Sequence, residues 1–133
     1  MGFKLKIVTP EKVFFEGEVD ILNIKLTKGY TGILPKHMPL VSMVEIAPMN
    51  FKQGKITREM AVHGGVLNVK EDETLLLVNA IEYKEDIDIE RAKKAEQRAR
   101  QRLENRDQDI DIKRAQAALN RALVRNKVYT RIK

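Results

Sequence analysis

The sequence predicts an α+β fold: an N-terminal antiparallel β sandwich, or flattened barrel, of about 8 to 10 short strands, followed by a C-terminal antiparallel two-helix hairpin. The composition changes sharply along the chain, since all seven glycines lie at or before Gly65 and all four prolines lie at or before Pro48. Before that change apolar residues alternate with polar ones, and after it one short pattern occurs twice. We therefore expect a sandwich domain over residues 1–84 and a helical domain over residues 85–133.

The strands are predicted by a period of two. Phe3, Leu5 and Ile7 alternate with lysines, and a turn follows at residues 9–12. The next run changes its apolar phase near Ile21 and Leu22, which predicts a β-bulge there, because one extra residue exchanges the two faces of a strand. Later strands are expected at 44–46, 56–62, 66–69 and 75–81, separated by Pro48, Gln53-Gly54, Gly64-Gly65 and residues 71–73.

The second part of the chain contains an internal echo. The run at residues 86–92 (DIDIERA) returns 23 residues later, at 109–115, as DIDIKRA. Each copy is typical of a helix start, because Asp accepts bonds from free backbone N–H groups and complements the positive end of the helix dipole. The link at residues 105–108 is short, so the two helices are expected to run antiparallel. Helical spacing predicts a buried face rich in alanine on each helix, formed by Ala92, Ala95, Ala99 and Leu103 and by Ala115, Ala118, Leu119, Ala122 and Leu123.

The composition gives no support to an enzyme. Without cysteine the chain has no disulfide, no catalytic thiol and no thiolate metal site. His37 and His63 each stand beside turn residues with no second ligand at metal spacing, so we expect ordinary surface or hydrogen-bonded histidines and no metal site. Motifs for a catalytic serine, a zinc protease or a phosphate-binding loop are absent from the sequence. The N-terminal run alternates with lysine, and the longest apolar run spans only residues 75–78, so we expect a cytosolic protein or one that docks on a cytosolic partner.

Positive charge is concentrated in the helical part. Residues 85–133 carry 14 basic and 9 acidic side chains, which places +5 of the net charge of +6 there. Arg91 and Arg98 are seven residues apart and Arg121 and Arg125 are four apart, so each pair shares a helix face. Folding the hairpin about Asp107 brings the four arginines together, and their mutual repulsion favours a bound anion such as a polyphosphate. The alternative is a solvated basic face whose arginines pair with Asp or Glu.

Three stretches of the sequence carry a resemblance to a known family. They are residues 29–40 (GYTGILPKHMPL), 63–69 (HGGVLNV) and 86–92 (DIDIERA). In this order and spacing they resemble the epsilon subunit of bacterial F-type ATP synthase, and the likeness spans essentially the whole chain. It implies a sandwich that binds the gamma subunit and the ring of c subunits within the rotor. It also implies a hairpin that switches between a compact form and an extended form along gamma, which inhibits ATP hydrolysis.

The resemblance implies a regulatory ATP site as well. The family motif is Ile or Leu, then Asp, two variable residues, Arg and Ala, and it is matched here at Ile87, Asp88, Arg91 and Ala92. The family's accompanying acidic residue and three further arginines correspond to Glu82, Arg98, Arg121 and Arg125. The base of ATP is expected near residues 87–92 and the phosphates among the arginines. ATP is implied as a regulatory ligand, and the motif fixes no role for Mg²⁺.

Two further positions are expected at a partner interface. Where the family usually has an acidic residue after the glycine of the loop that faces the c ring, this chain has Tyr30, whereas the family's histidine is retained as His37. The resemblance thus implies a non-catalytic regulatory subunit of the rotary, proton-transporting ATP synthase. It implies a place in the central rotor stalk, at the cytoplasmic face of the bacterial cell membrane, which the subunit meets only through the complex. The implied partners are gamma, the c ring and, when the hairpin is extended, the alpha and beta subunits.

Two other functions are compatible with parts of the sequence. A nucleic-acid-binding module would use the basic hairpin against phosphate backbones, but it leaves the acidic helix starts and the scarcity of aromatic residues unexplained, so nucleic acid is not an expected partner. A structural clamp would have a hairpin that never moves. The clamp predicts that deleting everything after Glu85 leaves hydrolysis by the assembled enzyme unchanged.

Overall fold

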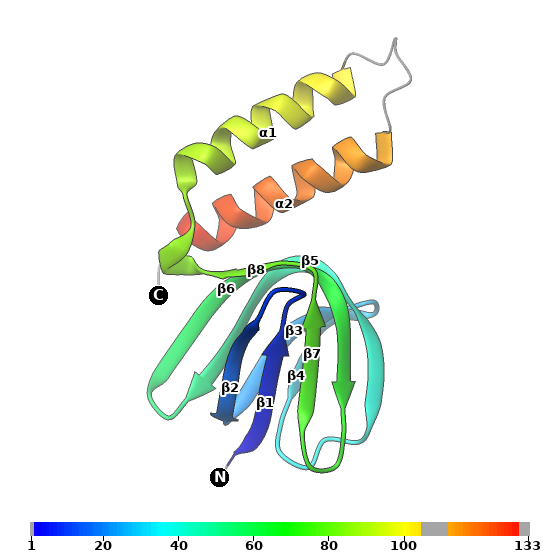
Figure 1. Cartoon of the computed structure of the whole chain (residues 1–133), viewed down its shortest axis with the longest axis vertical. Coiled ribbons are helices and arrows are strands. Elements are labelled where there is room, and N and C mark those ends of the chain that lie inside the picture. The colour runs from blue at the N-terminus through cyan, green and yellow to red at the C-terminus, as the bar shows by residue number, and fades with distance from the viewer. Residues whose placement is uncertain (1, 105–111, 131–133) are drawn as a thin grey trace.

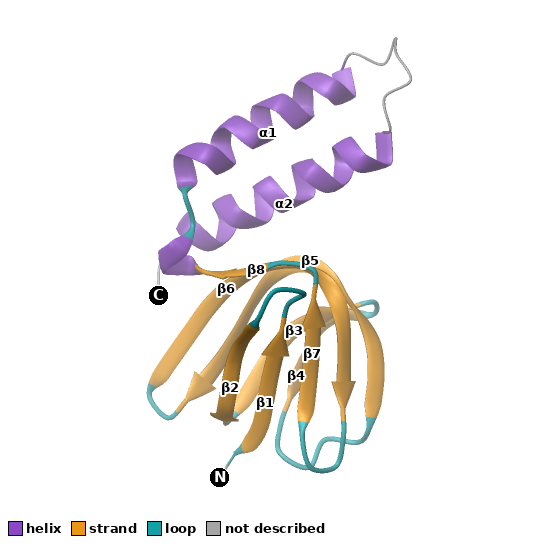
Figure 2. Cartoon of the chain, in the orientation of Figure 1, coloured by secondary structure: helices purple, strands orange, loops and turns teal. Residues whose placement is uncertain are grey.

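A computed structural model describes residues 2–104 and 112–130 of the chain. Within these ranges the strands all end by residue 83 and the helices all begin after it, as Figure 2 shows. The two long helices sit at one end of a folded sheet, and the N-terminus lies towards the opposite end (Figure 1). The predicted α+β architecture, a β sandwich followed by two helices, is therefore confirmed. The expected link at residues 105–108 lies outside the described residues.

The sandwich is one strongly folded sheet of eight strands. They are β1 (Phe3–Val8), β2 (Val13–Val19), β3 (Ile21–Leu26), β4 (Gly29–Ile33), β5 (Leu40–Gln53), β6 (Ile56–Val69), β7 (Thr74–Val78) and β8 (Ile81–Tyr83). The strand order is β2-β1-β7-β6-β5-β3-β4, and β8 also pairs with β6. The sheet is not closed, and its pairs are antiparallel apart from β1 with β7, which is parallel. That pair departs from the expected all-antiparallel sandwich, and the long excursion through β2 to β6 supplies the crossover that a parallel pair needs.

Two of the expected strand breaks are wrong. Pro48 lies inside β5 and Gly64-Gly65 lie inside β6. Pro48 is tolerated because β3 pairs with β5 on either side of it, at Val44 and at residues 50–52, and not at the proline itself. Gly65 is needed for close approach, since a Cβ there would lie 2.1 Å from the Leu77 carbonyl oxygen of β7. These residues bend or tighten long strands and do not end them.

The expected β-bulge at Ile21 and Leu22 is also wrong. The chain bends at Asp20, between β2 and β3, and this bend exchanges the apolar phase. Val19 before it and Leu22 after it are therefore both fully buried. The predicted strand at 75–81 is divided at residues 79–80 into β7 and β8, and both parts pair with β6.

The helices begin where the first echo predicts. A short 3-10 helix, η1 (Lys84–Asp86), leads into α1 (Ile89–Glu104), and α2 spans Ile112–Thr130. The Asp88 carboxylate accepts a hydrogen bond from the backbone N–H of Arg91 at 3.1 Å, which caps the free end of α1. Asp86 belongs to η1 and not to the helix start. In the second echo, residues 109–111 lie outside the described residues.

The helix faces follow the prediction in part. Ala92 and Ala99 on α1 are buried, as are Ala115, Leu119 and Ala122 on α2, whereas Ala95, Leu103 and Ala118 are half-buried. Leu123, expected on the buried face, is 38% exposed. The expectation fails because α2 lies between α1 and the sheet (Figure 1), so it needs a second apolar face. Val124 and Val128 supply that face and pack with Ala61 of β6 and Ile87.

Candidate functional site

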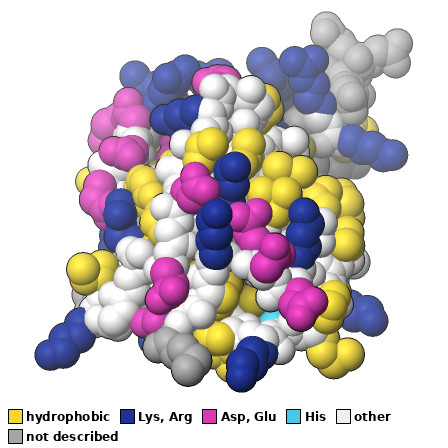
Figure 3. Space-filling view, turned by 60° about the horizontal axis from the view of Figure 1, so that its bottom comes forward, with side chains coloured by type: hydrophobic (Ala, Val, Ile, Leu, Met, Phe, Trp, Pro, Cys, Tyr) yellow, Lys and Arg dark blue, Asp and Glu magenta, His cyan; other side chains and the backbone are white. Residues whose placement is uncertain are grey.

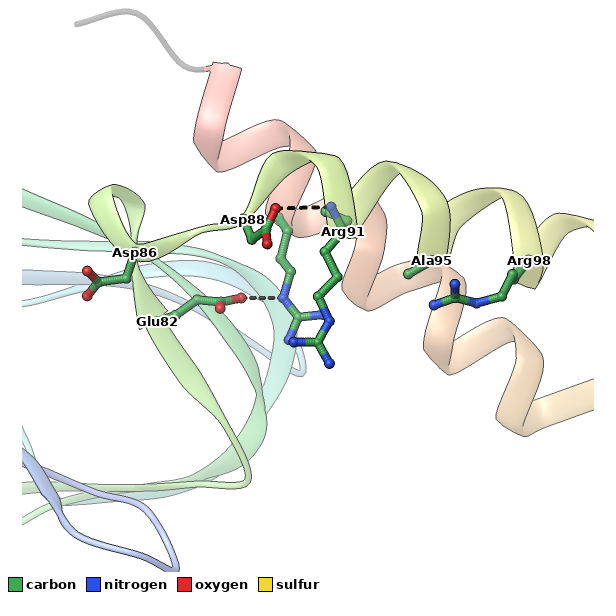
Figure 4. A pocket seen from close by; sticks show the side chains of 8 residues that line it. Glu82, Asp86, Asp88, Arg91, Ala95 and Arg98 are labelled. Carbon is green, nitrogen blue, oxygen red and sulfur yellow. Dashed lines mark hydrogen bonds and ion pairs between the residues drawn. The ribbon is translucent and has the colours of Figure 1, made fainter.

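A cleft opens where the sandwich meets the two helices. It has a volume of about 440 Å³ and is lined by Glu82, Asp86, Asp88, Arg91, Ala92, Ala95, Arg98 and Arg125 (Figure 4). Six of the eight residues predicted to bind ATP are therefore brought together, from β8, the residue that caps α1, α1 itself and α2. A cleft of this size is typical of small-molecule sites in proteins.

Two predicted residues are not part of the lining. Ile87 is 5% exposed and packs in the apolar cluster with Ala61, Val124 and Val128, so it anchors the start of the hairpin. Arg121 stands one helical turn before Arg125 on α2 and is half-buried outside the lining. Conversely, Asp86 and Ala95 line the cleft although the sequence prediction did not include them.

One face of α1 forms a wall of the cleft. Arg91, Ala95 and Arg98 are four and seven residues apart, so they lie along one helix face. The small side chain of Ala95 leaves space between the two arginines, and Figure 4 shows the three residues following one another along the helix. Among the described residues no ion pair engages the guanidinium group of Arg91 or Arg98. These two cations are available to an anionic ligand.

The opposite wall is an ion pair between the sandwich and the hairpin. Arg125 Nε of α2 donates to Glu82 Oε1 of β8. In Figure 4 the Glu82 side chain points towards this guanidinium, whereas the Asp86 carboxylate points away from the arginines. The same Glu82 oxygen lies 3.4 Å from His63 Nε2. Burial alone would raise the pKa of Glu82, but the hydrogen bonds from His63 and Arg125 outweigh it and hold that pKa below its ordinary value.

His63 is a residue of this site that the sequence did not identify. It was expected to have an ordinary surface or hydrogen-bonded role, and it is 4% exposed and lies behind Glu82. The contact depends on the pairing of β6 with β8, which places Ala61 opposite Glu82 and Val62 opposite Ile81. That pairing joins residues about twenty positions apart, and no local pattern in the sequence predicts it.

The two predicted interface residues lie in different grooves. Tyr30 of β4 is 57% exposed, and its hydroxyl donates to the Pro48 carbonyl at 3.4 Å, in a groove between β5 and α2. His37 lines a separate cleft of about 370 Å³ between the loop after β4 and the β6-β7 turn. Apolar side chains near His37 and along β5 are exposed; these are Leu34, Met38, Val41 and Met43. Figure 3 shows apolar patches set among mixed acidic and basic side chains on the sandwich end away from the hairpin.

The described residues contain no group of three or more His, Asp or Glu side chains that could hold a metal ion. No helix among them combines the length and the apolar character that a membrane span requires.

The chain matches models of one family over nearly its whole length. Residues 2–84 match the beta-sandwich domain of the ATP synthase delta/epsilon chain, and residues 85–129 match the long alpha-helix domain of the same chain.

Individual relatives and solved structures agree with this match. An ATP synthase epsilon chain of Desulforamulus reducens is 42% identical over 124 residues, which cover 93% of this chain and 94% of that relative. In fold, the chain is similar to chains in two mitochondrial ATP synthases. In the Euglena gracilis F1/c-ring structure the TM-score is 0.84 at 19% identity, over 95% of this chain and 80% of that one. In the Tetrahymena thermophila central stalk and c-ring structure the TM-score is 0.67 at 14% identity, over 98% of each chain. The chain therefore belongs to the ATP synthase delta/epsilon family, as an epsilon subunit of the bacterial F-type enzyme.

Proposed function

We propose that this epsilon subunit binds ATP in the cleft between its sandwich and its hairpin, and that bound ATP keeps the hairpin closed. The observation that carries the proposal is the convergence of three arginines from two helices on one cleft that also holds a carboxylate of the sandwich. A polyphosphate suits this arrangement, because each guanidinium offers a planar fork of donors to phosphate oxygens. The subunit itself performs no chemistry in this proposal.

The orientation of ATP follows from the charges. The triphosphate lies against Arg91 and Arg98, which are free to receive it, and it draws Arg125 away from Glu82. Arg121, one turn along α2, reaches the outer phosphate. The base then lies at the start of α1, beside Asp88 and the buried Ala92 and close to Ile87. Whether Mg²⁺ accompanies the phosphates is decided by comparing binding with and without the ion.

The regulatory effect follows from differential binding. The cleft is lined by β8, α1 and α2 together and is complete only when the hairpin is folded onto the sandwich, so ATP binds the closed form and not the extended one. At about 100 times its Kd, ATP stabilises the closed form by roughly 2.7 kcal/mol. When ATP falls, the hairpin is released, extends along gamma and, with its net charge of +5, meets the alpha and beta subunits and inhibits hydrolysis.

The sandwich is the part that docks in the rotor. We place gamma and the c ring at the exposed side chains of Tyr30, Met38 and Val41 and at the half-buried His37, because apolar patches of this kind mark protein interfaces. Of the two similar structures, the Tetrahymena thermophila one is of the central stalk and c ring, and the Euglena gracilis one is of F1 and the c ring. The subunit is thereby held peripherally at the cytoplasmic face of the cell membrane, in the rotor that couples proton flow to ATP synthesis.

Binding of ATP to the isolated full-length chain tests the site. The chain has no cysteine, so dyes on Lys70→Cys and Lys94→Cys report the distance between sandwich and hairpin without further changes. ATP is expected to bind with micromolar to millimolar affinity and to fix the short distance. Arg91→Ala and Arg98→Ala are each expected to weaken binding at least about tenfold, since each removes a charge-assisted hydrogen bond.

Two controls separate the site from the general effects of charge and helix stability. Arg102→Ala removes an exposed arginine of α1 outside the cleft and is expected to leave the affinity for ATP unchanged. Asp88→Ser keeps a capping side chain at the start of α1 while removing the carboxylate, so a loss of ATP affinity in this variant reports the site and not the helix. Equal affinities in the wild type, Arg91→Ala and Arg98→Ala would reject the assignment.

A further inference from the structure

His63 is a buried polar side chain immediately behind the cleft. It is 4% exposed, and its Nε2 lies 3.4 Å from Glu82 Oε1. Its backbone is fixed in β6, because the N–H donates to the Ala80 carbonyl at 3.0 Å and the carbonyl accepts a bond from Asn79 Nδ2 at 3.5 Å. The imidazole thus reaches the cleft only through the carboxylate of Glu82.

The hydrogen bonds define the state of this histidine without ATP. A carboxylate only accepts hydrogen bonds, so Nε2 carries the proton and donates to Glu82. Nδ1 is buried and has no hydrogen-bond partner among the described residues. A second proton on Nδ1 would gain little while Arg125 already neutralises Glu82. The ring therefore faces Glu82 through Nε2, and Nδ1 is the position at which a second proton could be bound.

A bound polyphosphate changes this balance. If Arg125 turns to the phosphates, Glu82 keeps its negative charge in a place where 26% of its side chain is exposed, and it loses its cationic partner. The carboxylate then has one other bonded neighbour, His63. An imidazolium there replaces the guanidinium, and its attraction to the unpaired carboxylate exceeds the cost of one unpartnered N–H.

The other charged groups around the pair favour the added proton, are paired with one another or are occupied by the ligand. On the elements packed around it, they are Glu59 of β6, Lys84 and Asp86 of η1, Asp88 just before α1, Arg91 and Arg98 of α1, and Arg121 and Arg125 of α2. Lys84 lies 3.7 Å from Glu59. The arginines are taken up by the phosphates, whereas the carboxylates and the phosphates themselves favour an added proton on His63.

We propose that His63 is the positioning residue of the ATP site: it holds Glu82 in place, and it binds one proton from solvent at Nδ1 when Arg125 exchanges Glu82 for the phosphates of ATP. This inference rests on the proposed ATP site and adds to it a dependence on pH. Because the ATP-bound form carries the extra proton, ATP binds more tightly as the pH falls from 8 to 6. Acidification of the cytoplasm would then favour the closed, non-inhibiting hairpin.

Calorimetric titration of the full-length chain with ATP between pH 6 and pH 8 tests the proposal. His63→Gln retains an N–H donor for Glu82 and cannot take up a proton, so it is the matched control. As the pH is lowered from 8 to 6, the wild-type Kd is expected to fall about threefold to tenfold per pH unit relative to the Kd of this variant. The wild type is also expected to show proton uptake, read from the change of the binding enthalpy with the ionisation enthalpy of the buffer. The titration of ATP itself contributes equally to both proteins and cancels in the comparison.

A spectroscopic measurement gives an independent readout. The chain has two histidines, so the ¹⁵N shifts of the His63 ring can be followed with the half-buried His37 as an internal reference. His63 is expected to be neutral without ATP and protonated with it at pH 7, and His37 to be unchanged. His63→Leu, which also removes the donor, is expected to bind ATP about tenfold more weakly than His63→Gln at all pH values.

The outcomes distinguish the two proposals. If ATP binds, and the wild type and His63→Gln share one pH profile while the His63 ring stays neutral, the inference is wrong and the ATP site stands. If the wild type does not bind ATP at all, both are wrong.

Discussion

Glu82 joins the two parts of the molecule through a single oxygen atom. Its Oε1 accepts bonds from Arg125 of the hairpin and from His63 of the sandwich. The side chains of Glu82 and Arg125 are 26% and 30% exposed, so their attraction is screened by water less than that of a surface pair. A carboxylate in this position stabilises the closed form when it is ionised.

The pH dependence of stability follows from the pKa of Glu82. That pKa is below its ordinary value of 4.5 in the folded chain, because the bonds from His63 and Arg125 outweigh burial. A lowered folded pKa gives stability that is complete above about pH 4.5 and is lost as the pH falls through the folded pKa. Glu82→Gln is therefore expected to lower the free energy of unfolding by about 1–2 kcal/mol at pH 7, with the difference shrinking towards pH 3. Urea unfolding at several pH values measures it.

A matched substitution three residues away controls this measurement. Glu85 is 63% exposed and lies 3.8 Å from Arg58, and an exposed pair of this kind contributes little. Glu85→Gln is expected to change the free energy of unfolding by less than about 0.5 kcal/mol at any pH. A Glu82→Gln difference that stays constant from pH 7 to pH 3 would contradict the role given to the ionised carboxylate.

At the scale of elements, α2 is held on two sides. Its alanines face α1, and Val124 and Val128 face the sandwich together with Ile87 and Ala61. The alanine seam buries small side chains, so the larger apolar contribution that fixes the hairpin comes from the valine face. The closed position of the hairpin thus depends on few side chains.

Shortening one of these valines tests that dependence. Val128 is 0% exposed, and Val128→Ala is expected to destabilise the docked hairpin by roughly 1.5–3 kcal/mol, through lost burial and the cavity that remains. Leu123→Ala on the same helix is the control, since Leu123 is 38% exposed and its truncation is expected to be nearly neutral. Hydrogen exchange of α2 amides, compared with amides of β6, separates release of the hairpin from global unfolding. Equal exchange in the two variants would contradict the proposed docking face.

The sequence predicts these elements well where one periodicity dominates. The alternation at Phe3–Ile7, the change of composition after β8 and the Asp88 cap all correspond to local physics, and the structure agrees with them. Prediction failed at Pro48 and Gly65, because proline and glycine usually end strands. Here Pro48 lies where β3 does not pair with β5, and Gly65 allows the backbone of β7 to approach closely. It failed at Leu123 because spacing alone does not reveal that a helix has two packed faces.

The same distinction explains the candidate site. Arg91 and Arg98 follow from helical spacing, and the ion pair of Glu82 with Arg125 joins positions that the resemblance had already named. His63 and Asp86 could not be predicted, since the pairing of β6 with β8 and the η1 turn decide their positions. Strand registers between distant segments depend on tertiary structure, so a short stretch of the sequence does not predict them.

At the scale of the whole molecule, the sandwich has a core of its own. The principal apolar cluster, from Leu5 to Val78, contains residues of the strands and none from the helices. The hairpin is attached through a separate small cluster around Ile87 and through the Glu82–Arg125 pair. A sandwich without its hairpin is therefore expected to fold and to dock, which allows the role of the hairpin to be tested in the assembled enzyme.

Deletion of residues 85–133 distinguishes a switch from a clamp. In the assembled ATP synthase, the truncated subunit is expected to raise ATP hydrolysis several-fold over the full chain when ATP is below its Kd for the cleft, because the released hairpin is the inhibitor. At about 100 times Kd the difference should nearly vanish, since roughly 2.7 kcal/mol then holds the hairpin closed. Full-length Arg98→Ala, which binds ATP poorly, should remain inhibited at both concentrations, so its rate separates the effect of ATP on epsilon from its effect as substrate. A static clamp instead predicts equal rates of ATP hydrolysis by all three enzymes at each concentration. Equal rates would contradict the proposal that ATP in the cleft regulates hydrolysis.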